Sequence, residues 1–427
     1  MSFLDERSEL LEDAYAALSK NYKGIDVDLY DVCKKQRLSD PVIEGDFMKS
    51  LEVATHADTR HTHPVYAVFK YHDIRKVLTD AKTFTSGFIR YGLGKFFGGD
   101  ALIILALDGQ EHKEMRALMK PIFMPANVNH YRETITKIIR EEFVEPMVPL
   151  KKANLMDFGL YFPIRIIYEL VGFPESWRED IYEIAAMGLL ILAGPKKDEE
   201  DLQAALERAN EAADHMRSRL VELAKLKRAE GATGRDFMSQ LIHAEYKGKK
   251  MNDHEVGTFA GTLLPAGGET TTRTFSCLMA IMLSNPELWE RLRNDRSLVP
   301  KAINEATRYE GVATVKIRQA SEDTEIRGVK IPKGALVQCL VASANRDEEV
   351  FENPDVFDMD RKQTANFTFG FGPHMCIGQF VAKMELEVAV NALLDLLPNL
   401  RLDPDYPKPE IKGAQLRGAS EIRVLWD

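Results

Sequence analysis

The sequence has few cysteines, no long apolar run and no excess of basic residues. Its 427 residues include only Cys33, Cys277, Cys339 and Cys376, which are too widely spaced for a disulfide scaffold or for paired zinc or redox motifs. No stretch of 18 apolar residues occurs, so no membrane anchor is expected. The charged N-terminus lacks the features of a signal peptide. We therefore expect a cytoplasmic protein.

The net charge of −10, from 56 basic and 66 acidic residues, argues against nucleic-acid binding. Such binding depends on neutralisation of phosphates by Lys and Arg. A local basic patch for an acidic partner protein remains compatible with this balance.

No repeat, low-complexity tract or Gly/Ser/Pro linker divides the chain, so we expect a single domain over residues 1–427. Helical periodicity dominates residues 108–310 and 376–396, whereas residues 40–70 and 312–345 are richer in β-type runs. The predicted fold class is mainly α with small β-sheets. The more local expectations are a strand at 65–69, a helix at 72–80, a long irregular loop at 85–107, an amphipathic helix at 198–230 and one long apolar helical stretch at 252–284.

The segment FTFGFGPHMCIG, residues 367–378, places a cysteine in a glycine-rich turn just before a predicted helix. Glycines permit tight turns and close backbone approach. A thiol at a helix N-terminus is shifted toward the thiolate. A buried structural cysteine is the alternative interpretation of a lone cysteine in such a turn.

The whole segment resembles the haem-binding loop of the cytochrome P-450 monooxygenases, Phe-Gly-x-Gly-x-His-x-Cys-x-Gly. The matching residues are Phe369, Gly370, Gly372, His374, Cys376 and Gly378. The resemblance implies the cytochrome P-450 fold, with haem b between a long distal helix and the helix that follows the cysteine loop. It also implies that Cys376 is the iron ligand, that Phe369 packs near the sulfur and that His374 reaches a haem propionate.

A second matching segment is LLPAGGETT, residues 263–271. Taken alone, its proline and glycines fit either a kinked helix or a loop between two helices. In the family this is the long helix over the distal face of haem. The resemblance then implies that Ala266 and Gly267 border the haem, and that Glu269 and Thr270 deliver protons to dioxygen.

Two further segments resemble family positions that hold the haem or support its loop. In EATR, Glu305 and Arg308 share one helix face and match the family's Glu-x-x-Arg network; taken alone they could be a surface pair. The position matching the third member of that network is Val356, which leaves the third partner open. His112, Arg116 and Arg318 match propionate-binding residues. Asn366 stands where a histidine is common.

The resemblance implies a monooxygenase that activates dioxygen and oxidises a small, mostly apolar substrate. The alternatives are a thiolate-haem sensor and a peroxide-driven enzyme, and the Glu269–Thr270 pair favours oxygen activation over both. No flavin or iron–sulfur segment is present, so we expect a separate ferredoxin or flavodoxin, with its reductase, to supply electrons. Candidate contacts for that partner are Lys113, Lys120 and Lys383.

The substrate pocket is expected to be lined by apolar residues from segments that border it in the family. The candidates are Phe88, Phe96, Phe97, Ile103, Leu189, Leu263, Val312, Val315 and Leu416. Arg90 would pair with a substrate carboxylate if it pointed inward, although an outward position is the simpler expectation.

Overall fold

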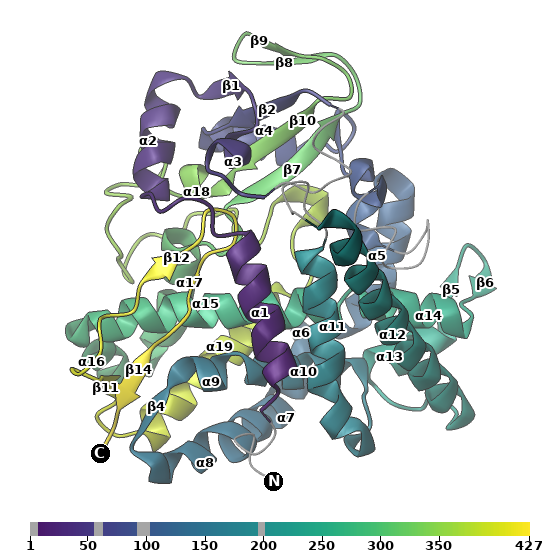
Figure 1. Ribbon diagram of the computed structural model, residues 1–427, viewed down its shortest axis with the longest axis vertical. Coiled ribbons are helices and arrows are strands. Elements are labelled where there is room, and N and C mark those ends of the chain that lie inside the picture. Colours follow the sequence, from purple (N-terminus) through teal and green to yellow (C-terminus); the bar gives the residue numbers. More distant parts are fainter. Residues whose placement is uncertain (1–6, 55–62, 92–102, 195–200) are drawn as a thin grey trace.

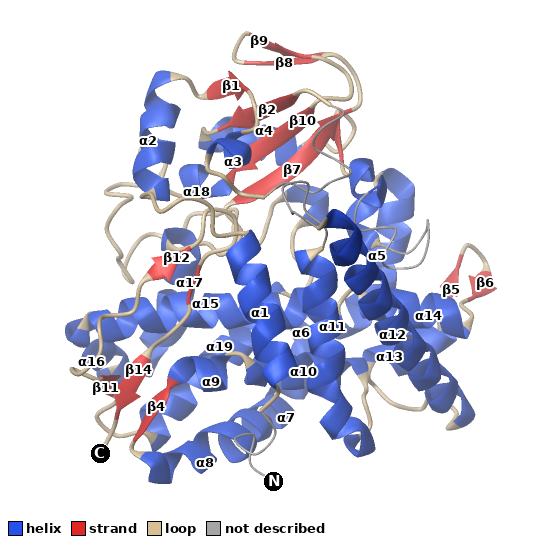
Figure 2. Cartoon of the chain, viewed as in Figure 1, coloured by secondary structure: helices blue, strands red, loops and turns tan. Residues whose placement is uncertain are grey.

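A five-stranded sheet lies at one end of a body made mostly of helices (Figures 1 and 2). The computed structural model describes residues 7–54, 63–91, 103–194 and 201–427. The sheet has the order β1-β2-β10-β7-β3, in which β10 is parallel to β2 and antiparallel to β7. Its strands are β1 (Val42–Glu44), β2 (Val65–Val68), β3 (Phe84–Thr85), β7 (Val315–Ala320) and β10 (Leu336–Leu340). The expected fold class is confirmed, as is the strand expected at 65–69.

The longest helix of the interior is α15 (Leu264–Ser284), which contacts α10, α11, α17 and α19. Every residue from 271 to 283 is buried, which suits a helix that is apolar around most of its circumference. The other helices used below are α1 (Glu9–Asn21), α2 (Leu29–Ser39), α4 (Tyr71–Thr79), α5 (Gly109–Phe123), α10 (Tyr161–Val171), α11 (Ile181–Ala193), α12 (Leu202–Ala229), α14 (Asp253–Gly261), α17 (Val299–Tyr309) and α19 (Gln379–Leu396). Helices α4 and α12 confirm the helices expected at 72–80 and 198–230.

The remaining elements are shorter and cover the body or connect its helices. The helices among them are α3 (Phe47–Ser50), α6 (Pro125–Val128), α7 (Arg132–Lys137), α8 (Glu145–Met147), α9 (Leu155–Gly159), α13 (Phe237–His243), α16 (Pro286–Asn294) and α18 (Val341–Ala344). The strands are β4 (Lys152–Asn154), β5 (Glu245–Tyr246), β6 (Lys249–Lys250), β8 (Thr324–Ile326), β9 (Val329–Ile331), β11 (Arg401–Leu402), β12 (Ile411–Lys412), β13 (Gly418–Ala419) and β14 (Arg423–Leu425). None of the helices in the part of the chain that the structure describes is long and apolar enough to cross a membrane.

The apolar stretch at 252–284 is two helices, α14 and α15, so of the two interpretations left open for the proline–glycine segment the break between two helices is the one observed. A capping box starts α14: Glu255 N donates to Asn252 Oδ1 at 2.9 Å, and Asn252 N donates to Glu255 Oε2 at 2.8 Å. Helix α14 ends at Gly261 and α15 begins at Leu264, with Pro265 in the first turn of α15. A proline lacks the N–H that a continuous helix needs but fits a first turn, so the interruption falls just before it.

In its described parts, the segment expected as an irregular loop at 85–107 contains the short 3₁₀ helices η1 (Gly87–Tyr91) and η3 (Ile104–Ala106). Residues 92–102, including the pocket candidates Phe96 and Phe97, lie outside the described residues.

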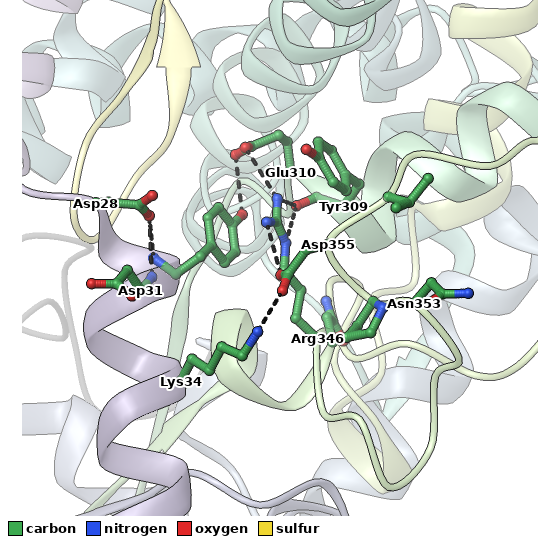
Figure 3. A network of polar contacts seen from close by, with 12 residues as sticks. Asp28, Asp31, Lys34, Tyr309, Glu310, Arg346, Asn353 and Asp355 are labelled. Carbon is green, nitrogen blue, oxygen red and sulfur yellow. Dashed lines mark hydrogen bonds and ion pairs between the residues drawn. The ribbon is translucent and has the colours of Figure 1, made fainter.

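A buried polar network ties α2 to the end of α17 (Figure 3). Tyr30 of α2 donates to Glu310 Oε2 at 3.0 Å, and the Arg346 guanidinium lies 3.5 Å from the centroid of the Tyr30 ring. Lys34, further along α2, donates to Asp355 at 3.0 Å. These contacts fix the chain where it leaves α17, immediately before the segment that leads into β7.

Candidate functional site

The cysteine loop, residues 367–378, is folded tightly by its own backbone. Cys376 N donates to the Phe369 carbonyl at 2.7 Å, and Gly370 has a φ of 74°. Gly372 has a φ of 70°, and a Cβ there would lie 2.5 Å from the Leu78 carbonyl oxygen of α4. A side chain at Gly372 would therefore be strained and would also collide with α4.

The thiol of Cys376 lies three residues before α19 and is accessible. Burial among protein atoms raises the pKa of the thiol, and the net direction is upward although the backbone N–H groups of Gly378 and Gln379 and the nearby cations of Lys316 and Arg116 act to lower it. N–H groups at a helix start favour negative charge on the sulfur. The arrangement suits a thiolate that binds a metal.

Four side chains from three segments form a basic cluster beside this loop: His112 and Arg116 of α5, Arg318 of β7 and His374. Arg116 donates to the Met375 carbonyl at 2.6 Å and so holds the loop next to the cysteine. The rings of His112 and His374 are 4.1 Å apart. The structure thus brings together residues that lie more than 250 positions apart in the sequence.

The basic cluster lacks carboxylate partners for most of its members. Among the described residues neither Arg116 nor Arg318 forms an ion pair, and Arg318 donates only to the carbonyl of its neighbour Ile317, at 2.8 Å. His112 is 2% exposed, and its Nε2 atom has no hydrogen-bond partner within the described ranges. Burial, together with His374 and Arg116, lowers the pKa of His112 to about 4, so this ring is neutral at neutral pH.

His374 differs from the other members because it has an acidic neighbour. Its Nε2 lies 3.3 Å from Asp108 Oδ1 and 3.4 Å from Ser86 Oγ. Burial raises the pKa of Asp108, but the hydrogen bonds from His374 and from Ser86 N outweigh it and the net direction is downward. Asp108 was not anticipated from the sequence; its place directly before α5 was the available signal.

Lys316 is a further cation that sequence analysis missed. It stands two residues before Arg318 on β7, so the two side chains share one face of the strand. Burial lowers the pKa of Lys316 to about 8, and Cys376 opposes that shift. The strand period of two, counted back from Arg318, could have identified it.

On α15, Ala266 and Thr270 are exposed although the helix is otherwise largely buried. The two residues are one turn apart, and Thr270 Oγ1 donates to the Ala266 carbonyl at 2.8 Å. Accessible positions in the first two turns of a helix whose later residues are buried indicate an opening along this face. Gly267 has a packing role as well, because a Cβ there would lie 2.9 Å from the Ile167 side chain of α10.

Glu269, the other proposed proton carrier, is 3% exposed and forms an ion pair with Arg273 one turn further along α15. Arg273 was not among the sequence-predicted residues. The spacing of four on one helix was the signal that could have found it.

Glu305 and Arg308 form a buried, bidentate pair with distances of 2.9 and 2.6 Å. The third partner is Arg361, whose Nε donates to Glu305 Oε1 at 3.1 Å. The position matched from the sequence, Val356, contributes only its carbonyl, which accepts from Arg308 and from Arg361. The surface-pair alternative for Glu305 and Arg308 is excluded, since they are 5% and 2% exposed.

Asn366 lies directly before the cysteine loop and is hydrogen-bonded to it. Its Oδ1 accepts from Thr368 N at 3.1 Å, and its Nδ2 lies 3.5 Å from Thr307 Oγ1 of α17. These contacts connect the loop to α17.

The described pocket candidates are all buried or half-buried. Ile103, Leu189, Leu263, Val312 and Val315 are buried, and Phe88 and Leu416 are half-buried. The segments of Val312 and Leu416 lie side by side, joined by a bridge between Ala313 and Leu416 and by the bond from Arg417 N to the Val312 carbonyl at 2.9 Å. Arg90 is exposed and pairs with Glu111 at 3.4 Å, so it points toward water.

The family is shown by comparison with known proteins. The family model of cytochrome P-450 matches residues 184–412. The chain is 31% identical over 362 residues to the putative cytochrome P-450 YjiB of Bacillus subtilis, covering 84% of this chain and 88% of that protein. It is 31% identical over 325 residues to vitamin D3 dihydroxylase of Streptomyces griseolus, covering 75% and 77%. The crystal structure of CYP109E1 from Bacillus megaterium in complex with testosterone superimposes with a TM-score of 0.78 at 25% identity, over 94% of this chain and 100% of that one.

The chain therefore belongs to the cytochrome P-450 family, in its bacterial form. Members of this family bind haem b. The residues of this chain fit that group: an accessible thiol is available for the iron, and the cations and the unpartnered His112 nitrogen suit the two propionate carboxylates.

Proposed function

We propose that Cys376 ligates the haem iron and that His112, Arg116, Arg318 and His374 hold the haem propionates. The protein is a haem-dependent monooxygenase that uses dioxygen and externally supplied electrons to oxidise a small organic substrate, as its named relatives indicate: nocardicin C N-oxygenase and mycinamicin IV hydroxylase/epoxidase. The observation that supports the residue assignment best is the accessible thiol before α19, beside cations that lack carboxylate partners. We also propose that residues 1–427 form one domain.

The ligand assignment is tested by the spectrum of the reduced, CO-bound protein. The native protein should show the red-shifted band of thiolate ligation, and Cys376→Ala should abolish it. Cys339→Ala, which removes a buried thiol of β10, serves as the matched control and should keep the band. Retention of the band by Cys376→Ala would disprove the assignment.

Proton handling is proposed for Thr270 and Glu269. When bound, the haem supplies the iron at which dioxygen is activated. The Thr270 hydroxyl donates its proton to the Ala266 carbonyl in this structure, and in the proposed role it turns that O–H into the opening along α15, with Glu269 as the adjacent acid that supplies it with a proton. Thr270→Ala should still bind ligands while reducing equivalents leak to hydrogen peroxide. Unchanged product per electron would contradict this role.

The electron donor is proposed to be a separate ferredoxin or flavodoxin with its reductase, docking near the cysteine loop. Lys113 and Lys120 are exposed on α5 and are the stronger candidate contacts. Lys383 is half-buried, with its Nζ 5.4 Å from the centroid of the Phe369 ring, so it has a packing contact as well. Lys113→Glu should slow reduction at low ionic strength, with an effect that fades as salt is added. The cytoplasmic location stays a prediction.

The proposed substrate is small and mostly apolar, because the described pocket candidates are apolar and Arg90 points away from them. A vitamin D3 dihydroxylase and a testosterone-bound structure among the similar proteins agree with such a substrate. Ligand titrations followed by the spin-state shift of the haem absorption band test this. Tight binding of highly polar ligands, with no response to apolar ones, would contradict it.

A further inference from the structure

The proposed proton donor is held by an arginine inside the protein. Glu269 and Arg273 are each 3% exposed and form an ion pair within α15. Thr270, the neighbour of Glu269, uses its hydroxyl to donate to Ala266. The arginine therefore sets where the Glu269 carboxylate lies.

Arg273 also connects this carboxylate to the N-terminal helix α1. Its Nη2 donates to Ser19 Oγ at 2.9 Å, and its guanidinium lies 4.8 Å from the centroid of the Tyr15 ring. Ser19 Oγ in turn donates to the Tyr15 carbonyl at 2.8 Å. Since Tyr15 and Ser19 are half-buried, a line of polar groups runs from Glu269 to the outer edge of the α1–α15 contact.

Water-sized positions adjoin this line. The Tyr15 hydroxyl is buried and has no partner among the described residues, and such groups are normally satisfied by water. On another side of Glu269, a cavity of about 10 Å³ lies between α10, α11 and α15, lined in part by Ile164, Leu189 and Pro265. Apart from Glu269 this lining is apolar, so the cavity is not a polar water site, and the line of polar groups runs only through Arg273, Ser19 and Tyr15.

We propose that Arg273 is a positioning residue for Glu269, and that the contact between α1 and α15, marked by Tyr15, Ser19 and Arg273, is the route by which solvent protons reach Glu269. This inference rests on the proposed role of Glu269 in proton delivery. The Glu269 carboxylate takes a proton from a water in the α1–α15 contact, and bulk solvent re-protonates that water. The new O–H bond breaks as the proton passes toward Thr270, and the carboxylate returns to its ion pair with Arg273. No electrons move in this step. The guanidinium keeps its own protons at physiological pH, so Arg273 orients the carboxylate and the water and carries no proton itself.

The test uses four substitutions that leave Glu269 and Thr270 in place. Arg273→Met should lower product per electron by about 10-fold or more, with hydrogen peroxide rising in proportion, because a positioned acid contributes on that scale. Ser19→Ala and Tyr15→Phe should give smaller losses and a larger solvent deuterium isotope effect. Arg273→Lys, which keeps the charge, should restore part of the coupling. Ligand titrations by spin-state shift should be unchanged in all of them.

A second readout needs no turnover. Removal of Arg273 leaves Glu269 buried without a cation, so the resting holoenzyme of Arg273→Met should show a protonated-carboxyl infrared band at neutral pH that is lost in Arg273→Met/Glu269→Gln. The matched control is Ser8→Ala, which removes the N-cap of α1, where Leu11 N donates to Ser8 Oγ at 3.3 Å, and leaves the polar line intact. Ser8→Ala should give the same product per electron as the native protein.

Three results would overturn the inference: native coupling in Arg273→Met, an equal peroxide leak in Ser8→Ala, or no carboxyl band. If Glu269→Gln uncouples the enzyme and the α1–α15 variants do not, only this inference fails. If Glu269→Gln itself stays coupled, the proposed role of Glu269 fails as well.

Discussion

Two arginine-rich clusters lie on either side of the cysteine loop, and they differ in whether their charges are paired. In the cluster around Glu305, the carboxylate accepts from Arg308 and Arg361, and the remaining guanidinium N–H groups donate to backbone carbonyls. In the cluster around His112, Arg116 and Arg318 have no carboxylate among the described residues. A buried charge is stable when it is paired, so the first cluster is complete within the protein and the second suits an acidic ligand.

The largest expected effect comes from breaking the complete cluster. Glu305→Ala leaves two buried guanidinium groups without their carboxylate, which should cost about 3–5 kcal/mol of unfolding free energy. Denaturant unfolding of the purified protein measures it. Glu290→Ala, which removes an exposed pair with Arg293, is the control and should leave the unfolding free energy essentially unchanged. A loss for Glu305→Ala below about 1 kcal/mol would show that pairing does not separate the two clusters.

The opposite outcome is expected in the incomplete cluster. Arg318→Met removes a buried cation that has no carboxylate partner, so the haem-free chain should be as stable as the native one, or more so. Haem affinity should fall by about 10- to 100-fold, because charge-assisted hydrogen bonds to a propionate are lost. Haem titration and denaturant unfolding measure the two quantities separately. A fall in haem-free stability comparable to that of Glu305→Ala would contradict the assignment.

A smaller effect should identify the third member of the Glu305 cluster. Arg361→Ala removes the bond to Glu305, together with bonds to the carbonyls of Glu352, Asn353 and Val356, at a side chain that is 12% exposed. About 1–2 kcal/mol of stability should be lost. Val356→Ala keeps the carbonyl that Val356 contributes and trims an exposed side chain, so its cost should stay within about 0.5 kcal/mol. Equal losses of stability in the two variants would contradict the assignment of Arg361 as the third member of the cluster.

The last prediction concerns Glu385, a buried acid for which the described residues provide no ion pair. Replacing it should have almost no effect on the free energy of unfolding at acidic pH. Glu385 of α19 is 3% exposed, its Oε2 has no hydrogen-bond partner within the described ranges, and burial raises its pKa well above 4.5. Its protonated form therefore contributes stability that is fully present below pH 4.5 and is lost as the pH rises toward the folded-state pKa. Glu385→Gln should match the native protein near pH 4 and become the more stable of the two as the pH rises, with a relative slope of up to about 1.4 kcal/mol per pH unit. Parallel unfolding curves at every pH would contradict this.

Local features were predictable because a short segment carries their whole cause. The glycines and the cysteine of residues 367–378, the capping box of Asn252 with Glu255, and the end of α15 before Pro286 each depend on neighbours in the chain. The sequence by itself thus determined the family, the proposed iron ligand and the candidate distal helix. The similarity to known cytochromes P-450 extends over most of the chain.

The partners of charged groups were decided only by the tertiary structure. Arg361, not the residue at 356, reaches Glu305, because the path of the loop after residue 352 sets which side chain turns inward. Asp108 meets His374 because α5 and the cysteine loop come together from positions 266 residues apart. Ser19 meets Arg273, 254 residues away, because α1 packs on α11 and thereby comes within side-chain reach of α15. Sequence spacing specifies which residues share a helix face or a strand face, whereas ion pairing over such separations depends on how segments pack, and no local pattern encodes that.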